Sequence, residues 1–108
     1  MAKRIRLFGP SQIPTTPATV FTNVTGKAAR LESLTIAQPA AGLAKTVRLS
    51  IGTDAAATRW FEYPIAAGAG TTTIFPNLVL TGTETLQLSS TADNNIAIAS
   101  GSGTEEAV

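Results

Sequence analysis

Residues 77–102 read NLVLTGTETLQLSSTADNNIAIASGS, and this stretch decides the fold class. Leu86 and Leu88 alternate with polar residues, and a period of two is typical of a half-buried β-strand. Clusters of Gly, Asn and Asp flank that strand, and these residues accept the left-handed backbone that tight turns need. We therefore predict a β-meander of antiparallel strands, in which Ile96 and Ile98 continue the inward alternation in the last strand.

The same pattern recurs along the chain. Residues 46–52 place Val47, Leu49 and Ile51 on one face and Arg48 and Ser50 on the other, which predicts a central strand. Short strands are also predicted at 27–37, 59–65 and 71–75, separated by turn clusters. This spacing predicts an all-β fold, a single antiparallel β-sandwich or jelly-roll-like domain with an extended N-terminal arm.

Two strands carry further detail in their apolar pattern. In 27–37 the apolar face switches between Leu31 and Leu34, which indicates a β-bulge or a strand that passes between sheets. In 59–65 Trp60 and Phe61 are neighbours, and neighbours in a strand face opposite ways. One of these two aromatic side chains should therefore point outward.

The ends of the chain differ from its middle. Three prolines in 1–19 remove ladder donors, so we expect 1–19 to be an extended Pro-rich arm, 20–103 to be the β-sandwich, and 104–108 to be an acidic C-terminal tail. Exposure of the arm's apolar side chains to water would be unfavourable, so the arm is predicted to lie along a neighbouring subunit or shell. The candidate partner contacts are Lys3, Arg4, Arg6, Phe8, Ile13, Trp60 and Tyr63.

Composition argues against most chemistry. The 108 residues carry a net charge of +1 and contain neither Cys nor His, which removes thiol catalysis, the commonest general base and the usual zinc ligands. The Asp and Glu residues are scattered over turns and outward strand positions. We therefore predict no enzymatic activity, no catalytic residue, no cofactor and no metal, with no nucleic-acid partner.

Two local motifs are interpreted structurally. The longest charge-free run, 63–83, contains Gly, Pro and Asn and is not a membrane helix, so no membrane partner is predicted. Asn23, Val24 and Thr25 match a glycosylation sequon, but no secretory signal precedes them, and we interpret the motif as a turn.

Four segments together resemble the small virion proteins of tailed bacteriophages. They are FTNVTGKAARLESLTI at 21–36, VRLSIG at 47–52, LVLTGTETLQLSS at 78–90 and IAIASG at 96–101. The resemblance covers about residues 20–103 and implies a β-sandwich that assembles on the particle, often as a trimer. It implies a head decoration (cement) protein or a neck or tail accessory protein. The segment 2–19 has no counterpart in that pattern.

Two functional hypotheses follow. The first is a non-enzymatic structural component of a phage particle, a capsid decoration protein made in the host bacterial cytoplasm and located in the virion, with the major capsid protein or neck and tail proteins as partners. The second is a neck or tail accessory, or an adsorption-related carbohydrate-binding module that uses the outward aromatic of 59–65 and Tyr63 for stacking. Residues 71–75 and 85–88 carry no charge or Pro to protect a sheet edge, so we predict a homo-oligomer, a trimer by the resemblance.

Overall fold

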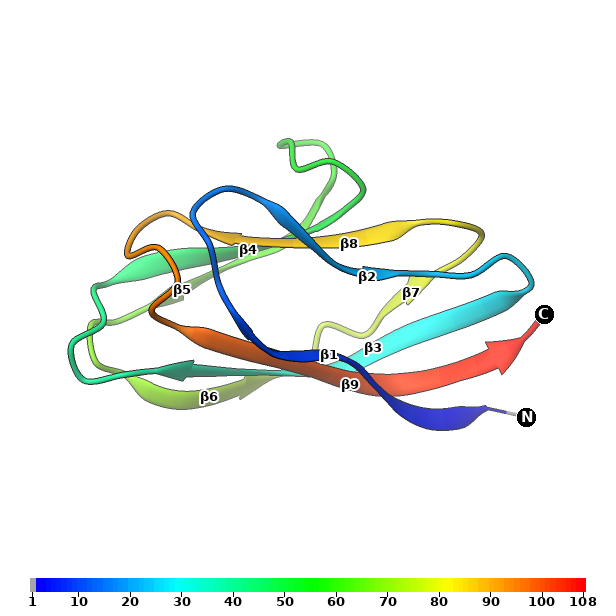
Figure 1. Ribbon diagram of the computed structural model, residues 1–108, viewed down its shortest axis with the longest axis horizontal. Coiled ribbons are helices and arrows are strands. Elements are labelled where there is room, and N and C mark those ends of the chain that lie inside the picture. The colour runs from blue at the N-terminus through cyan, green and yellow to red at the C-terminus, as the bar shows by residue number, and fades with distance from the viewer. Residues whose placement is uncertain (1) are drawn as a thin grey trace.

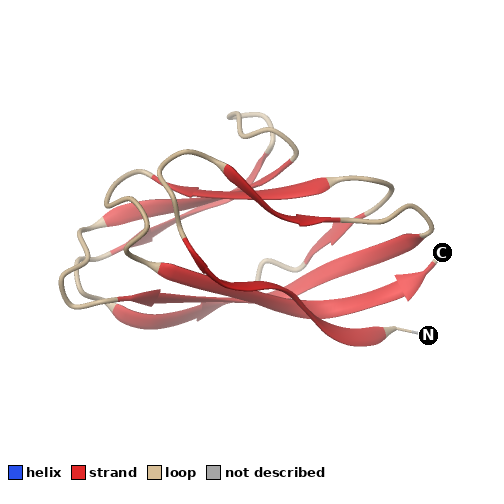
Figure 2. Ribbon diagram, viewed as in Figure 1, coloured by secondary structure: helices blue, strands red, loops and turns tan. Residues whose placement is uncertain are grey.

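The computed structural model describes residues 2–108, which form two antiparallel sheets packed face to face (Figure 1). Sheet A holds, in order across the sheet, β1 (Lys3–Gln12), β9 (Ile98–Ala107), β3 (Lys27–Gln38) and β6 (Gly70–Ile74), and the short β7 (Leu78–Leu80) also pairs with β3. Sheet B holds β2 (Ala18–Thr22), β8 (Thr85–Ser90), β4 (Lys45–Ile51) and β5 (Arg59–Ile65). Over the described residues the chain consists of strands and loops (Figure 2). The predicted all-β sandwich is confirmed.

The strand order is that of a jelly roll. With β7 set aside, the first strand pairs with the last (β1 with β9), the second with the next to last (β2 with β8), and so on inward to β3 with β6 and β4 with β5. The ribbon of paired strands then folds over, so that β9 lies beside β3 in sheet A and β8 lies beside β4 in sheet B. Two such four-stranded sheets are the double Greek-key arrangement of the jelly roll.

The predicted meander is wrong. Within 77–102, β7 pairs with β3, β8 pairs with β2 and β4, and β9 pairs with β1 and β3, so consecutive strands enter opposite sheets. The alternation in the sequence correctly indicated strands, because each strand has one face on the core. The period of the hydrophobic alternation does not determine which strand of the sheet each strand pairs with.

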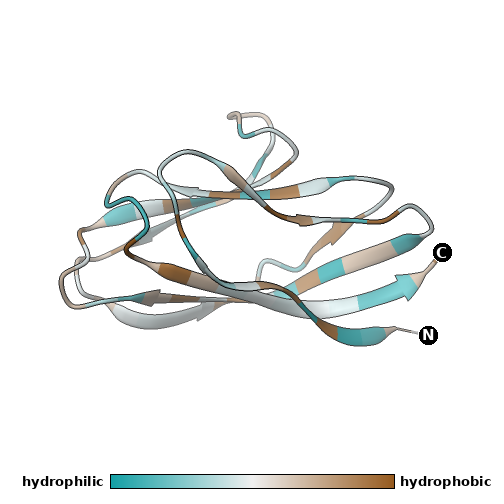
Figure 3. Ribbon diagram, viewed as in Figure 1, coloured by the Kyte–Doolittle hydropathy of each residue, from teal (hydrophilic) through white to brown (hydrophobic). Residues whose placement is uncertain are grey.

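The core lies between the inner faces of the two sheets. Hydrophobic and hydrophilic residues alternate along the strands (Figure 3), and the buried residues of sheet B include Val47, Leu49, Leu86 and Leu88. The predicted bulge is confirmed, because the register of β3 against β9 shifts between Leu31 and Ser33. Ser50 has the outward parity that was expected but is buried, because the loop after β4 covers it.

The N-terminal segment belongs to the sandwich, so the prediction of a separate arm is wrong for residues 3–12. They form β1, which pairs with β9 from Lys3 opposite Glu105 to Gln12 opposite Ile98. Two register shifts, between Arg6 and Phe8 and between Phe8 and Ser11, let the strand accommodate Pro10 at the sheet edge. Apolar side chains from this segment fill the core, namely Leu7, Phe8 and Ile13.

The last strand also differs from the prediction. The strand begins at Ile98, and Ile96 lies in the turn before it. Both Ile side chains are 41% exposed, while Ala97 and Ala99 are buried. The inward positions of β9 continue as Gly101 and Gly103, and the Phe8 ring occupies the space where a Gly101 side chain would be. Small residues therefore take the inward face because neighbouring side chains and backbone already fill the core beside it.

The acidic tail is likewise part of the sheet. Residues 98–107 form β9, so Glu105 and Glu106 stand on a strand opposite Ala29 and Ala28. Lys27 Nζ lies 3.4 Å from the Glu105 carboxylate within the same chain. The prediction of a separate tail at 104–108 is therefore wrong for 104–107.

Asn23 illustrates how the loops are fixed. Its side chain is buried, and its Nδ2 donates hydrogen bonds to the carbonyl oxygens of Lys27 at 2.7 Å and Gly82 at 2.9 Å. The amide thus ties the turn before β3 to the turn before β8. In the folded protein this nitrogen is occupied, which agrees with interpreting the sequon as a turn.

Candidate protein interaction site

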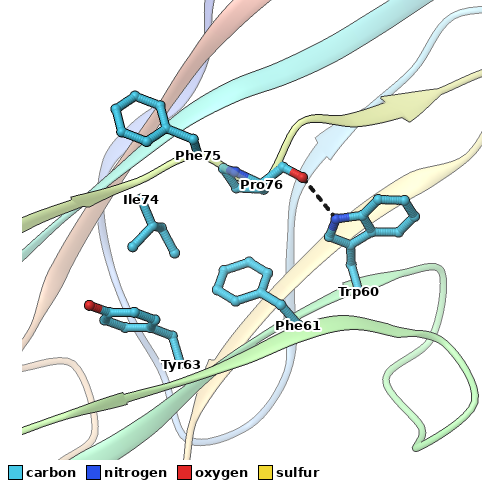
Figure 4. A pocket seen from close by; sticks show the side chains of 6 residues that line it. All are labelled: Trp60, Phe61, Tyr63, Ile74, Phe75 and Pro76. Atoms are coloured by element: carbon cyan, nitrogen blue, oxygen red, sulfur yellow. Dashed lines mark hydrogen bonds between the residues drawn. The ribbon is translucent and has the colours of Figure 1, made fainter.

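A cleft opens along one side of the sandwich, where edge strands of both sheets meet. Six residues line it, and its volume is about 310 Å³. β5 and the segment that ends β6 supply them (Figure 4): Trp60, Phe61, Tyr63, Ile74, Phe75 and Pro76. We call this the edge cleft. It exists because β5 ends sheet B and β6 ends sheet A, so no further strand covers the gap between them.

Strand parity divides the aromatic residues between floor and rim. Phe61 and Tyr63 are partly buried and pack against the core, as does Ile74 from β6. Trp60 has the opposite parity and leaves 50% of its surface exposed, and Phe75 leaves 76% exposed. The structure thus confirms that one member of the Trp60–Phe61 pair points outward.

A hydrogen bond holds the rim of the edge cleft in place. Trp60 Nε1 donates to the Pro76 carbonyl oxygen at 3.1 Å, which joins β5 to the connection between β6 and β7 (Figure 4). Two of the six lining residues carry a polar side-chain group, the indole N–H of Trp60 and the hydroxyl of Tyr63. The indole N–H is already used in the bond to Pro76. A lining of this kind suits an apolar surface and offers no acid–base pair for chemistry.

The backbone edge beside the cleft is unprotected. β6 reads GTTTI, with no charged residue and no Pro, and it pairs only with β3 among the strands of residues 2–108. Natural sheet edges usually carry charge, Pro or a bulge that discourages another strand from pairing. The prediction that 71–75 is an edge is confirmed, but that for 85–88 is wrong, because β8 lies between β2 and β4.

A second feature is a row of basic side chains on the outer face of sheet A. Arg4 and Arg30 both stand opposite Thr104, so the three residues form one row across β1, β9 and β3. Arg4, Arg6 and Arg30 are exposed and form no ion pair within residues 2–108, although Arg30 Nη1 donates to Asn77 Oδ1 at 2.9 Å. Sequence reasoning missed Arg30, because only the pairing of β3 with β9 brings it to the N-terminal cluster.

The outer side of sheet B carries paired charges. The Asp54 carboxylate accepts hydrogen bonds from Arg59 Nε at 3.1 Å, Arg59 Nη2 at 3.2 Å and Ser50 Oγ at 2.6 Å. These bonds, first that from Arg59 and then that from Ser50, hold the pKa of the Asp54 carboxyl below its ordinary value. They fasten the loop after β4 to β5, and they explain why Ser50 is buried.

The predicted contact residues separate into three groups. Trp60 and Tyr63 lie together in the edge cleft. Lys3, Arg4 and Arg6 are exposed on β1. Phe8 and Ile13 are 6% and 0% exposed, so the prediction that they are partner contacts is wrong; they are core residues.

Two further observations concern membrane and metal sites. Across residues 2–108 there is no helix long and apolar enough to cross a membrane. In the same residues, no three acidic side chains come together as a set that could hold a metal ion.

Comparison with known proteins gives structural matches alone. No protein-family model matches this chain, and no curated protein sequence matches it. Among solved structures, matches include "Structure of infectious bursal disease virus Gx strain" (TM-score 0.49, 16% identity) and "Crystal structure of infectious bursal disease virus VP2 subviral particle" (TM-score 0.41, 15% identity). Each match covers 97% of this chain, which spans 31% of the length of those chains.

Proposed function

We propose that the protein is a non-enzymatic structural component of a phage particle, a capsid decoration (cement) protein that binds the assembled shell as an oligomer. The sequence resemblance to small virion proteins of tailed bacteriophages supplies the context. The observation that carries the proposal is the edge cleft, with its exposed Trp60 and Phe75 beside the unpaired edge of β6.

The edge cleft supports an assembly role for a physical reason. Exposed aromatic side chains that gather beside an open sheet edge are characteristic of surfaces covered by another protein. Scattered exposed apolar residues need no such explanation, but Trp60 is held at the rim by its bond to the Pro76 carbonyl oxygen. A fixed aromatic rim loses little conformational entropy when it is covered, which favours its use as a contact.

The shell contact is assigned to the outer face of sheet A. Arg4, Arg6 and Arg30 are available for charge-assisted hydrogen bonds, because carboxylates of their own chain do not engage them in the described structure. The partner we propose is an acidic patch on a shell protein. Exposed pairs of this kind are each worth about 0–1 kcal/mol, so several copies bound side by side would be needed for stable attachment.

A neck or tail accessory that binds carbohydrate is the second candidate, and one observation favours it. Jelly rolls also serve as lectin domains, and the edge cleft presents Trp60 and Tyr63 as stacking surfaces. Sugar sites combine such surfaces with several polar groups that fix orientation. Because the six lining residues include no carboxylate or amide side chain, we rank this candidate second.

The proposal is tested by measuring copy number and rebinding. Quantitative mass spectrometry of purified particles should find the protein in many copies per shell, and purified protein should rebind to particles that lack it. The double variant Arg4→Gln, Arg30→Gln should bind more weakly and with a smaller salt dependence. Lys27→Gln is the matched control, because that cation is already paired with Glu105.

Two results would reject the proposal. One is absence of the protein from purified particles. The other is specific binding on a glycan array that is lost in Trp60→Ala, which would establish the second candidate instead.

A further inference from the structure

The open edge of β6 and the edge cleft lie on the same side of the sandwich. Along β6, Thr71 and Thr73 are exposed, and the strand has a partner only on its β3 side among the described strands. Its other side presents backbone N–H and C=O groups, which another strand can satisfy. The cleft between β5 and β6 opens beside that unpaired backbone.

We propose that a second copy of this chain docks along β6. The two β6 strands pair antiparallel about a two-fold axis near Thr72, so that Gly70 of one copy faces Ile74 of the other and sheet A continues into its partner. The same rotation brings the two edge clefts face to face, and the exposed aromatic rim of each copy is covered by the other. This inference names the partner that covers the edge cleft. It rests on the proposed function in one respect, namely that the edge cleft serves in assembly.

The composition and length of the five edge strands select β6. Among the described strands, β7 also pairs with β3 alone and carries no charge, but it is only three residues long. β1 carries Lys3, Arg4, Arg6 and Pro10 and two register shifts, all of which discourage pairing. β5 carries Arg59, Glu62 and Pro64. β2 is uncharged, but it follows Pro17 and has a register shift between Thr19 and Phe21. β6 has none of these features and pairs with β3 in continuous register from Gly70 to Ile74.

The exposed aromatic rim supplies part of the area that a dimer needs. A Trp or Phe side chain covers roughly 150–250 Å², so Trp60 at 50% exposure and Phe75 at 76% offer together about 250 Å² per copy. A standard interface buries about 800 Å² per partner. The aromatic rim therefore supplies about a third, and strand pairing with the neighbouring Thr residues supplies further area. Because both copies use the same surface, the contact is isologous and assembly through it stops at two copies. Neither copy then has an open β6 edge.

The first experiment measures mass and location together. Sedimentation of the full chain between about 1 and 100 micromolar should show a transition from the 11.1 kDa monomer to twice that mass. Trp60 is the one tryptophan of the chain, so its fluorescence reports directly on the edge cleft. Its emission should shift to shorter wavelength, and its quenching by iodide should fall, over the same concentration range.

Variants separate this contact from other associations. Phe75→Glu and Thr71→Lys should each raise the dissociation constant at least about tenfold, the loss expected at a central contact. Leu43→Ala is the matched control, since Leu43 is also an exposed large apolar side chain but lies in the loop before β4. It should leave the dissociation constant unchanged, and circular dichroism should show that all three variants remain folded.

A cysteine cross-link tests the register. The chain contains no Cys, so Thr72→Cys introduces a single thiol. Residues opposite each other in an antiparallel pair have Cα atoms about 4.5–5.5 Å apart, which a disulfide can span. Mild oxidation should give a covalent dimer with Thr72→Cys and monomer with the control Leu43→Cys.

Four results would overturn the inference. They are monomer throughout the concentration range, the trimer that the sequence resemblance implies, self-association without a change in Trp60 emission, and failure of Thr72→Cys to cross-link. Particle rebinding is scored separately with the same variants. A protein that pairs through β6 but never enters particles would reject the proposed function alone. A protein that enters particles as an oligomer without pairing through β6 would reject this inference alone.

Discussion

The contact between Phe8 and Gly101 gives the sharpest test of the fold, because Phe8 was predicted to lie on a surface arm. Phe8 stands opposite Gly101 in the β1–β9 pairing, and its ring lies over the glycine. A Cβ added at Gly101 would come within 2.5 Å of Phe8 Cε1 and 2.8 Å of Leu31 Cδ1. The large residue and the small residue therefore fill one shared space.

The magnitudes follow from that geometry. Phe8→Ala removes a buried ring and should lower the free energy of unfolding by about 3–5 kcal/mol, a large part of the roughly 5–15 kcal/mol expected for a domain of this size. Gly101→Ala should cost about 1–3 kcal/mol by overpacking. In the double variant the added methyl enters space that the ring has left, so the total cost should be smaller than the sum of the single costs by about 1 kcal/mol or more.

The assay is urea unfolding at equilibrium, followed by Trp60 fluorescence and by circular dichroism so that two-state behaviour is checked. Arg4→Ala, an exposed substitution in the same strand, is the control and should change the unfolding free energy by less than about 0.5 kcal/mol. If Phe8→Ala behaves like this control, or if the Phe8 and Gly101 costs simply add, the placement of β1 over β9 described above is wrong.

Two further predictions concern β1 and the loop after β4. Deleting residues 1–12 should abolish cooperative thermal unfolding, because it removes the Leu7 and Phe8 side chains from the core and leaves β9 as an open edge; a truncated protein that still melts cooperatively would contradict the assignment. Asp54→Asn should lower the urea midpoint at pH 7, and the difference from the parent should shrink as the pH falls below 3.8. A carboxyl whose pKa is lower in the folded state stabilises above its unfolded pKa and loses that effect as the pH falls through the folded value. A midpoint difference that stays constant from pH 7 to about pH 2 would refute the role of the Asp54–Arg59 contact.

The sequence predicted elements well where large side chains alternate. Val47, Leu49, Leu86 and Leu88 were assigned to the inward face, and each is fully buried. The change of apolar parity after Leu31 predicted either a bulge or a strand that passes between sheets, and the structure shows the bulge. These are local properties, and they can be read within a few positions of the chain.

Pairing and the path of the ends were harder to predict. The prolines at 10, 14 and 17 suggested an arm, but a register shift between Phe8 and Ser11, which spans Pro10, lets β1 remain an edge strand of sheet A. Ile98 in β9 and Ile96 in the turn before it suggested the wrong inward face, since small Ala and Gly residues give no clear hydrophobic alternation. The fit of Gly101 beneath Phe8 joins residues far apart in sequence, so a local pattern does not reveal it.

The candidate site was predicted in part for the same reason. The outward aromatic at 59–65 followed from strand parity, and Tyr63 was correctly grouped with it in the edge cleft. Phe75 and Pro76 were not expected there, because they come from the other sheet. The grouping of Arg30 with Arg4 likewise depends on β9 lying between their strands.

The position of β9 has a consequence for the order of folding during synthesis. β9 is the last of the nine strands in the described chain, yet it lies between β1 and β3 and pairs with both. While the ribosome is still translating residues 98–107, β1 has no strand to pair with, and β3 lacks its neighbour on that side of sheet A. Contacts of such long sequence separation fold slowly, because the chain must close large loops before any pairing compensates for the lost entropy. The nascent chain should therefore stay sensitive to protease until β9 has left the ribosomal tunnel, and sheet A should form late and in one step.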